Sequence, residues 1–199
     1  MMIRFVIFDF GGVMVPKTVK ELYLKTAAAF NLDPTSVRKV WKSLEGKVSN
    51  SHITLGQFWQ SMAEGLNVKD AGKVERIWRQ HVYTRVIPIQ KMVQLVQDLK
   101  KKGYTVAVLS NVSDLFSDFH KVRGHYKIFD SIFLSHELGM VKPDLQIYKH
   151  TVEKLGMKPE ECVFIDDKKE NLVPAKQLGL HTIQFQSVTQ VRKELEKLL

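Results

Sequence analysis

Short apolar runs recur along this chain of 199 residues, and polar residues, glycines or prolines bound each of them. Such runs are far too short to cross a membrane and are typical of strands buried on both faces of a sheet. Five of them lie at residues 3–8, 104–109, 131–134, 162–165 and 182–185. The pattern therefore predicts five buried strands.

Helical patterns separate most of these runs, with apolar residues three or four positions apart, and proline or glycine often marks their ends. They cover Met92–Leu99, Ile147–Leu155, Leu172–Leu178 and a closing stretch, Val188–Leu199. Strands and helices that alternate along a chain form a mainly parallel sheet with helices on both faces. The expected fold class is therefore α/β, with a Rossmann-like core.

Residues 17–84 interrupt this alternation, because they contain no convincing strand. Their pattern predicts helices at Val19–Phe30, Pro34–Leu44, Leu55–Leu66 and Asp70–Val82, with enough aromatic residues for a small core. We therefore expect two domains: an α/β core formed by residues 1–16 and 85–199, and a small all-helical cap at 17–84. An insertion directly after the first strand would lie over that strand's end like a lid.

The charge of the chain suggests small anionic ligands rather than nucleic acid. The formal net charge is +9, but lysines and arginines are spread along the whole chain. No helix-turn-helix, zinc-finger or RNA-binding signature accompanies them, so no nucleic-acid partner is expected. We expect instead that the excess of positive charge attracts small anions.

The single cysteine, Cys162, excludes an internal disulfide framework and suits a reducing compartment. It lies within an apolar run, which favours a small buried side chain over a nucleophile. The chain lacks the pattern of a signal peptide or a membrane span. A cytoplasmic protein without a membrane partner, monomeric or homodimeric, is therefore expected.

Polar residues of complementary kinds follow the apolar runs. The first run ends in Asp9, followed by Gly11 and Gly12, whose backbone can turn sharply and approach a ligand closely. Ser110 and Asn111 end the second run, Lys142 precedes a helix after the third, and Asp166 and Asp167 end the fourth. Since the carboxyl ends of parallel strands share one edge of a sheet, these groups should converge around Asp9.

Each of these residues also has an ordinary explanation when taken alone. Asp9 could cap a turn, Lys142 could be a surface lysine and Ser110 could cap a helix. The adjacent Asp166 and Asp167 are harder to explain without a ligand, because two neighbouring carboxylates repel each other unless a cation binds them. Together, the groups are those that phosphoryl transfer requires.

Four motifs make the chain resemble the haloacid dehalogenase-like (HAD) hydrolase superfamily, in the subclass with a helical cap inserted after the first motif. The motifs are Phe8–Val13, Leu109–Asn111, Lys142–Asp144 and Ile165–Asn171, and they occur in the family's order. Any one of them is weak evidence, whereas four in order on alternating strands are specific.

The resemblance implies a nucleophile and a phosphate site. Asp9 would attack phosphorus and form an aspartyl-phosphate. Ser110, the backbone amide of Asn111 and the backbone at Gly12 would hold the phosphoryl oxygens. Lys142 would bridge the nucleophile and the phosphate and keep Asp9 ionised.

The resemblance also implies a Mg²⁺ site. Asp9, the backbone carbonyl of Gly11 and Asp167 would bind the cation directly, and Asp166 would be a further ligand or a partner of the ligands. Asn171 would orient the loop around them.

Gly11 departs from the pattern of the family's phosphatases, which usually carry a second aspartate at this position. That aspartate protonates the leaving group and then activates water, and the loss of such a group typically costs about 10²–10⁴ in rate. His52, in the loop between two predicted cap helices, is a candidate substitute. The alternative is that His52 is an ordinary solvated loop residue.

The leading hypothesis is therefore a Mg²⁺-dependent phosphatase acting on a small phosphorylated metabolite. A metal-independent 2-haloacid dehalogenase is an alternative, although it leaves the pair Asp166–Asp167 without a role. A catalytically weak protein that binds a phosphometabolite for regulation is another alternative, because Gly11 removes the usual proton donor.

Overall fold

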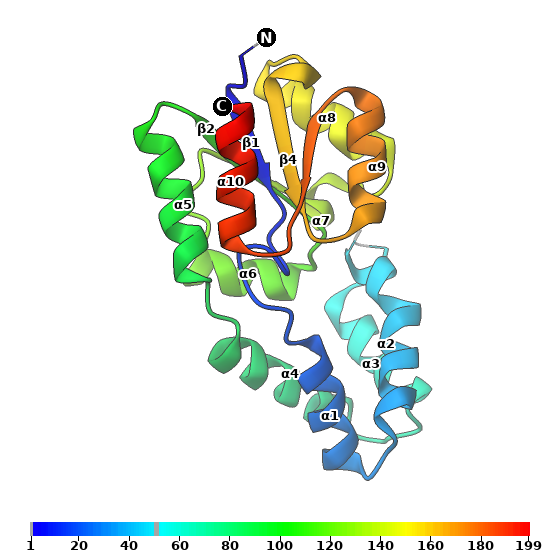
Figure 1. The fold of residues 1–199 in the computed structure, drawn as a ribbon. Helices are drawn as coiled ribbons and strands as arrows, with labels where there is room; N and C mark the ends of the chain where they lie inside the picture. The colour runs from blue at the N-terminus through cyan, green and yellow to red at the C-terminus, as the bar shows by residue number, and fades with distance from the viewer. Residues whose placement is uncertain (1, 50–51) are drawn as a thin grey trace.

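A five-stranded parallel sheet forms the centre of the larger part of the molecule (Figure 1). The computed structural model describes residues 2–49 and 52–199. The strands are β1 (Phe5–Phe8), β2 (Thr105–Ser110), β3 (Ser131–Leu134), β4 (Cys162–Asp166) and β5 (His181–Gln184), in the spatial order β3-β2-β1-β4-β5. The predicted fold class is confirmed, and each predicted strand is present within a few residues of its expected position.

The register of the sheet places the ends of the three central strands side by side. Phe8, the last residue of β1, lies opposite Val108 of β2 on one side and Ile165 of β4 on the other. Residues that directly follow β1 therefore meet the last residues of β2 and β4. This is the edge at which open parallel sheets bind ligands.

Alternating side chains of the central strand face two different layers of helices. Val6 and Phe8 pack in a core with α5 (Gln90–Lys101) and α10 (Val188–Leu198), whereas Ile7 packs in a second core with α8 (Leu145–Leu155) and α9 (Lys169–Leu178). Both faces of β1 are thus buried, which explains its nearly unbroken apolar sequence. A short 3₁₀ turn, Pro159–Glu161, leads into β4.

Four helices form a module with a hydrophobic core of its own. They are α1 (Val19–Phe30), α2 (Pro34–Ser49), α3 (Leu55–Gly65) and α4 (Ala71–Arg85). Trp78 is central to this core: its ring stacks on that of Trp41 with centroids 4.4 Å apart, and its Nε1 donates to Thr26 Oγ1 over 3.0 Å. We call residues 17–84 the helical module. Its role as a cap domain stays a prediction at this point.

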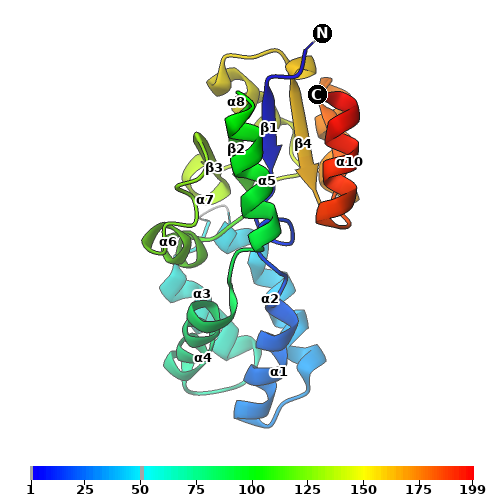
Figure 2. The same ribbon diagram turned by 60° about the vertical axis from the view of Figure 1, so that its left-hand side comes forward.

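The helical module lies beyond the carboxyl ends of the strands, as both ribbon views show (Figure 2). At the connections, Ile89 N donates to Met14 O over 2.8 Å. Further along, Ser135 Oγ donates to the Ser49 carbonyl over 2.6 Å. Ser135, which directly follows β3, therefore joins the helical module to the α/β part of the molecule by a hydrogen bond.

Two helices differ from the sequence-based expectation, which contains no helix between the second and third strands or directly after the third. They are α6 (Asp114–Val122) and α7 (Ser135–Leu138). Within α6, Phe119 is buried against the sheet, and Phe116 packs against both the sheet's core and the core of the helical module. Helix α6 thus fills the space between the two cores, a contact that no local pattern specifies.

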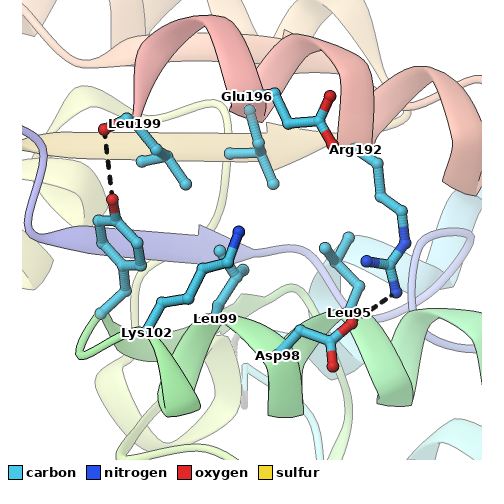
Figure 3. A pocket seen from close by; sticks show the side chains of 9 residues that line it. Leu95, Asp98, Leu99, Lys102, Arg192, Glu196 and Leu199 are labelled. Atoms are coloured by element: carbon cyan, nitrogen blue, oxygen red, sulfur yellow. Dashed lines mark hydrogen bonds and ion pairs between the residues drawn. The ribbon is translucent and has the colours of Figure 1, made fainter.

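A cavity of about 230 Å³ separates α5 from α10 at the edge of the sheet where β2 begins (Figure 3). Leucines from both helices line it, and the Arg192–Asp98 ion pair joins the helices at one end with its N and O atoms 3.0 Å apart. Tyr104 Oη donates to the Leu199 carbonyl over 3.3 Å, and both residues line the cavity. This cavity lies near the amino end of β2, whereas Asp9 lies at the carboxyl end of β1.

Among the helices of the described residues, none combines the length and the apolar character that a membrane span requires.

A pair of histidines beside the core makes stability sensitive to acid. His120 is buried, and its Nδ1 lies 2.8 Å from Nδ1 of His125, so one ring donates and the other accepts. Burial, with a smaller contribution from His125, lowers the pKa of His120 from 6.5 to about 3. The unfolded chain therefore binds the proton more readily, and stability is lost as the pH falls below 6.5.

We expect the substitution His120→Phe to remove this dependence. Between pH 7 and pH 5, the wild type should lose about 2 kcal/mol of unfolding free energy relative to the variant. Urea unfolding of both proteins at the two pH values measures the difference. Parallel changes in the two proteins would show that His120 titrates normally in the folded state.

Candidate active site

Asp9 directly follows β1 and is buried, with 7% of its surface exposed. Its backbone N–H donates to the Ile165 carbonyl over 2.8 Å, which fixes it beside the end of β4. The chain then turns sharply, and Gly12 N donates to Val15 O over 2.7 Å. Asp9 is thus held on a rigid backbone at the edge where the central strands end.

Lys142 lies at the centre of the site. Its Nζ donates to Asp9 Oδ1 over 2.8 Å, to Asp166 Oδ2 over 2.7 Å and to the Leu109 carbonyl over 2.8 Å. Only 1% of its side chain is exposed, so the alternative of a surface lysine is wrong. Burial tends to lower the pKa of Lys142, but the two carboxylates outweigh it and raise the pKa above its usual value, which keeps the ammonium charged.

Asn111 positions Lys142 through the backbone. Lys142 N donates to Asn111 Oδ1 over 2.8 Å, and Asn111 Nδ2 donates to the Lys142 carbonyl over 2.7 Å. Sequence reasoning assigned a role to the Asn111 backbone and missed this side-chain contact, which no local pattern indicates. Ser110 is buried at the end of β2, and because α6 begins at Asp114 with Ser113 as its N-cap residue, Ser110 does not cap that helix.

Asp166 is saturated with hydrogen-bond donors. Besides Lys142, Asn171 Nδ2 donates to its Oδ2 over 2.9 Å, and the backbone N–H of Lys168 donates to its Oδ1 over 2.8 Å. Tyr148 Oη in turn donates to the Asn171 carbonyl over 2.7 Å. Asp166 is therefore fixed in place from both sides, and Asn171 orients it.

Asp167 differs from its neighbour, because only one of its oxygens is paired. Its Oδ2 accepts from Lys17 Nζ. Its Oδ1 is buried and has no hydrogen-bond partner among the described residues. Lys17 is a site residue that sequence reasoning missed, since nothing in its local pattern distinguishes it from other lysines. A buried carboxylate oxygen without a donor is costly unless a cation binds it.

The three carboxylates fit a hard divalent cation. Asp9, Asp166 and Asp167 each offer an oxygen, and these oxygens lie within 4.8 Å of one another. Carboxylate oxygens together with water are the ligands that Mg²⁺ prefers. The unpaired Oδ1 of Asp167 is the oxygen that such an ion would satisfy.

The pKa of Asp9 reflects its crowded surroundings. Burial raises it from 3.8 to about 6, Lys142 opposes this effect and Asp166 adds to it. A nucleophilic carboxylate must be ionised. A cation between the carboxylates would favour the ionised form further.

The two glycines after Asp9 have different surroundings. Gly12 has a φ of +98°, and a Cβ at this position would lie 2.6 Å from Lys17 Cε and 2.9 Å from Asp167 Oδ1. A side chain there would therefore disrupt the site. A Cβ on Gly11, by contrast, would meet none of the described residues within 4 Å, so that part of the structure leaves the position open.

Two other residues considered from the sequence are His52 and Cys162. His52 is exposed in the loop after α2, and its backbone N–H donates to the Lys47 carbonyl over 2.8 Å. Its neighbours Asn50 and Ser51 lie outside the described residues, and its role as an acid stays a prediction. Cys162 is buried, and this burial is the main reason why the pKa of its thiol rises to about 12. The thiol therefore stays protonated, and Cys162 is not a nucleophile.

The sequence matches a family model over most of its length. The model describes haloacid dehalogenase-like hydrolases and matches residues 6–185. The chain belongs to this family. Membership places the chain among haloacid dehalogenase-like hydrolases. It does not specify which kind of bond is cleaved.

Curated relatives include enzymes of several activities. Bifunctional epoxide hydrolase 2 of Rattus norvegicus is 29% identical over 99% of this chain. The sesquiterpene phosphatase astK of Aspergillus oryzae is 34% identical over 56% of the chain and 58% of its own length. The (S)-2-haloacid dehalogenase 4A of Burkholderia cepacia is 24% identical over 92% of the chain and 83% of its own length. The chain spans only 39% of the length of the rat epoxide hydrolase.

A solved structure supports the fold. The HAD family enzyme BT-2542 of Bacteroides thetaiotaomicron, in complex with magnesium and inorganic phosphate, superposes with a TM-score of 0.70 at 21% identity. The superposition covers 92% of this chain and 94% of the other. At this level of identity the likeness establishes the shared architecture.

We expect the substitution Lys142→Met to destabilise the protein by about 3–5 kcal/mol, because it leaves the buried carboxylates of Asp9 and Asp166 without their common cation. Urea unfolding at pH 7 measures the loss. Lys100→Met is a matched control, because the Lys100–Asp130 pair is more than one-third exposed and should contribute less than about 1 kcal/mol.

Adding Asp9→Asn to Lys142→Met should restore part of the lost stability, since it removes one of the two unpaired charges. Equal losses for Lys142→Met and Lys100→Met would contradict the central role of the buried lysine.

Proposed function

We propose that this hydrolase is a Mg²⁺-dependent phosphatase that acts on a small phosphorylated metabolite through an aspartyl-phosphate at Asp9. One observation carries the proposal: a buried aspartate is paired with a buried lysine, and beside them lies a carboxylate oxygen to which no described residue donates. A nucleophile, a fixed cation and a place for a divalent cation are the groups needed to transfer a phosphoryl group.

The chain's own residues would act in two steps. In the first, the Asp9 carboxylate forms a bond to phosphorus while the bond from phosphorus to the leaving oxygen breaks. Lys142 holds Asp9 in position, and Ser110 and the backbone of Asn111 and Gly12 receive the phosphoryl oxygens. In the second step, water attacks the same phosphorus, inorganic phosphate leaves and the Asp9 carboxylate is regenerated.

Mg²⁺ would be held by Asp9, Asp167 and the Gly11 carbonyl, with Asp166 as a further ligand or partner, and would supply charge neutralisation at the phosphoryl oxygens. Because Gly11 carries no side chain, the departing oxygen must take its proton from solvent or from a group on the helical module such as His52. Substrates with good leaving groups should therefore react fastest.

We also propose that residues 17–84 act as a cap over this edge of the sheet. The module lies beyond the strand ends, and Ser135 bonds it to the rest of the chain close to the site. Substrate selectivity would then reside in the module. A cytoplasmic location and a monomeric or homodimeric state stay predictions from the sequence.

Dehalogenation is the second candidate, and two observations favour it. Gly11 lacks the acid that phosphatases of this family use, and a haloacid dehalogenase matches 92% of the chain. In that reaction the Asp9 carboxylate would displace a halide from carbon without a metal. The unpaired Oδ1 of Asp167 argues against it, because a metal-independent reaction gives that oxygen no role.

We expect the wild type to hydrolyse p-nitrophenyl phosphate only with Mg²⁺, and Asp9→Asn to lower kcat by at least about 10³, since it removes the nucleophile. A panel of phosphorylated metabolites and 2-chloropropionate, assayed with and without a chelator, measures the specificity. Equal turnover by Asp9→Asn contradicts the proposal, and chloride release in the presence of chelator supports the dehalogenase. Tight binding of phosphate ligands without turnover supports a regulatory protein.

We expect Gly11→Asp to raise kcat for alkyl phosphates by about 10–10²-fold and to change p-nitrophenyl phosphate hydrolysis much less, because only poor leaving groups need an acid. Position 11 has room for the side chain. Gly11→Asn is the matched control, since it fills the same space without a transferable proton. Equal gains in both variants would show that filling the space, rather than the acid, changes the rate.

A further inference from the structure

Lys17 is the first residue of the helical module, and its side chain reaches the site. Its ammonium pairs with Asp167 Oδ2, and its side chain crosses directly over the backbone of Gly12. The lysine side chain is 49% exposed, whereas that of Asp167 is 16% exposed. A flexible, half-solvated cation thus contacts a nearly buried carboxylate.

The two lysines of the site, Lys142 and Lys17, pair with different carboxylates. Lys142 contacts Asp9 and Asp166 and is fully enclosed. Lys17 contacts Asp167, whose other oxygen has no partner among the described residues. Lys142 is therefore an enclosed part of the site, while Lys17 is bound to a carboxylate that still has a buried oxygen without a donor among the described residues.

A divalent cation on Asp167 and the ammonium of Lys17 would repel each other strongly at contact distances, because the metal carries two charges. Both also draw on the same negative charge of one carboxylate. Lys17 can leave at little cost, because half of its side chain is already in water and an ion pair with such an exposed partner contributes little. The same exchange is closed to Lys142, which has no route to solvent.

We propose that Lys17 is an internal competitor for the divalent cation: its ammonium neutralises Asp167 when the metal is absent, and metal binding displaces it. The inference rests on the metal site of the proposed function. It assigns to Lys17 control of metal affinity rather than a step in the reaction.

Displacement would also change the backbone connection to the helical module. Lys17 lies two residues after Val15, which accepts a hydrogen bond from Gly12 N. The side chain that packs over Gly12 belongs to the segment that enters α1. Metal loading would therefore release a contact between the module's first residue and the loop that holds Asp9.

The test measures metal binding directly. Calorimetric titration of the metal-free full chain with Mn²⁺ and with Mg²⁺ compares the wild type with Lys17→Met, which keeps the length of the side chain and removes its charge. We expect Kd to fall about tenfold, a change of about 1.4 kcal/mol. Lys17→Arg should bind the metals like the wild type, because it keeps the charge.

Lys20→Met is the matched control for net charge, because Lys20 is an exposed lysine on α1. It should leave Kd within about twofold of the wild type. Thermal unfolding without metal checks that each variant folds, and Lys17→Gln replaces Lys17→Met if the latter does not.

The outcomes separate the two proposals. Metal binding that is equal or weaker in Lys17→Met and Lys17→Gln overturns the role of Lys17 and leaves the metal site intact. An equal gain in Lys20→Met reduces the effect to net charge and also overturns it. No heat of binding in any variant at millimolar Mn²⁺ overturns the metal site itself.

Discussion

The burial of one ammonium group, that of Lys142, is the constraint on which the site depends. A charge can be removed from water only where opposite charges and acceptors surround it. Here Asp9, Asp166 and the Leu109 carbonyl provide them. Asp9 directly follows β1, Asp166 ends β4 and Leu109 is the last but one residue of β2. The sheet must therefore keep the ends of β1, β2 and β4 level, as the register at Phe8 does.

The contacts around this lysine extend in both directions through the core. On one side the Asn111 side chain holds the Lys142 backbone through two hydrogen bonds. On the other, Tyr148 bonds the carbonyl of Asn171, whose amide holds Asp166. Helices α8 and α9, on one face of the sheet, thus hold Asp166 in place, and Asp166 in turn holds Lys142. Such a network holds Asp9, Lys142 and Asp166 in place without a bound ligand, which is the preorganisation that the proposed phosphatase would need.

Much of the fold could be predicted from the sequence, because the alternation of apolar runs and helical stripes is local information. The convergence of Asp9, Lys142 and Asp166 could also be inferred, since parallel strands end at one edge. The burial of Lys142, the clamp by Asn111 and the contact of Lys17 with Asp167 could not, because each joins residues far apart in the chain. Helix α6 was missed for a related reason: Phe116 acquires its role only from two cores that meet in space.

The site has a rigid half and an adaptable half, and the difference follows from exposure to water. Lys142 and Asp166 are enclosed and saturated with partners, so any exchange there would leave a buried charge uncompensated. Gly11 and Lys17 lie towards solvent, and Lys17 pairs with Asp167, whose buried Oδ1 has no partner among the described residues. Under the proposed function, the enclosed groups would determine which class of bond Asp9 attacks, whereas the groups nearer the surface would determine the metal affinity and the supply of protons. Changes at Gly11 and Lys17 would then alter the proposed activity without disturbing the buried charges around Lys142.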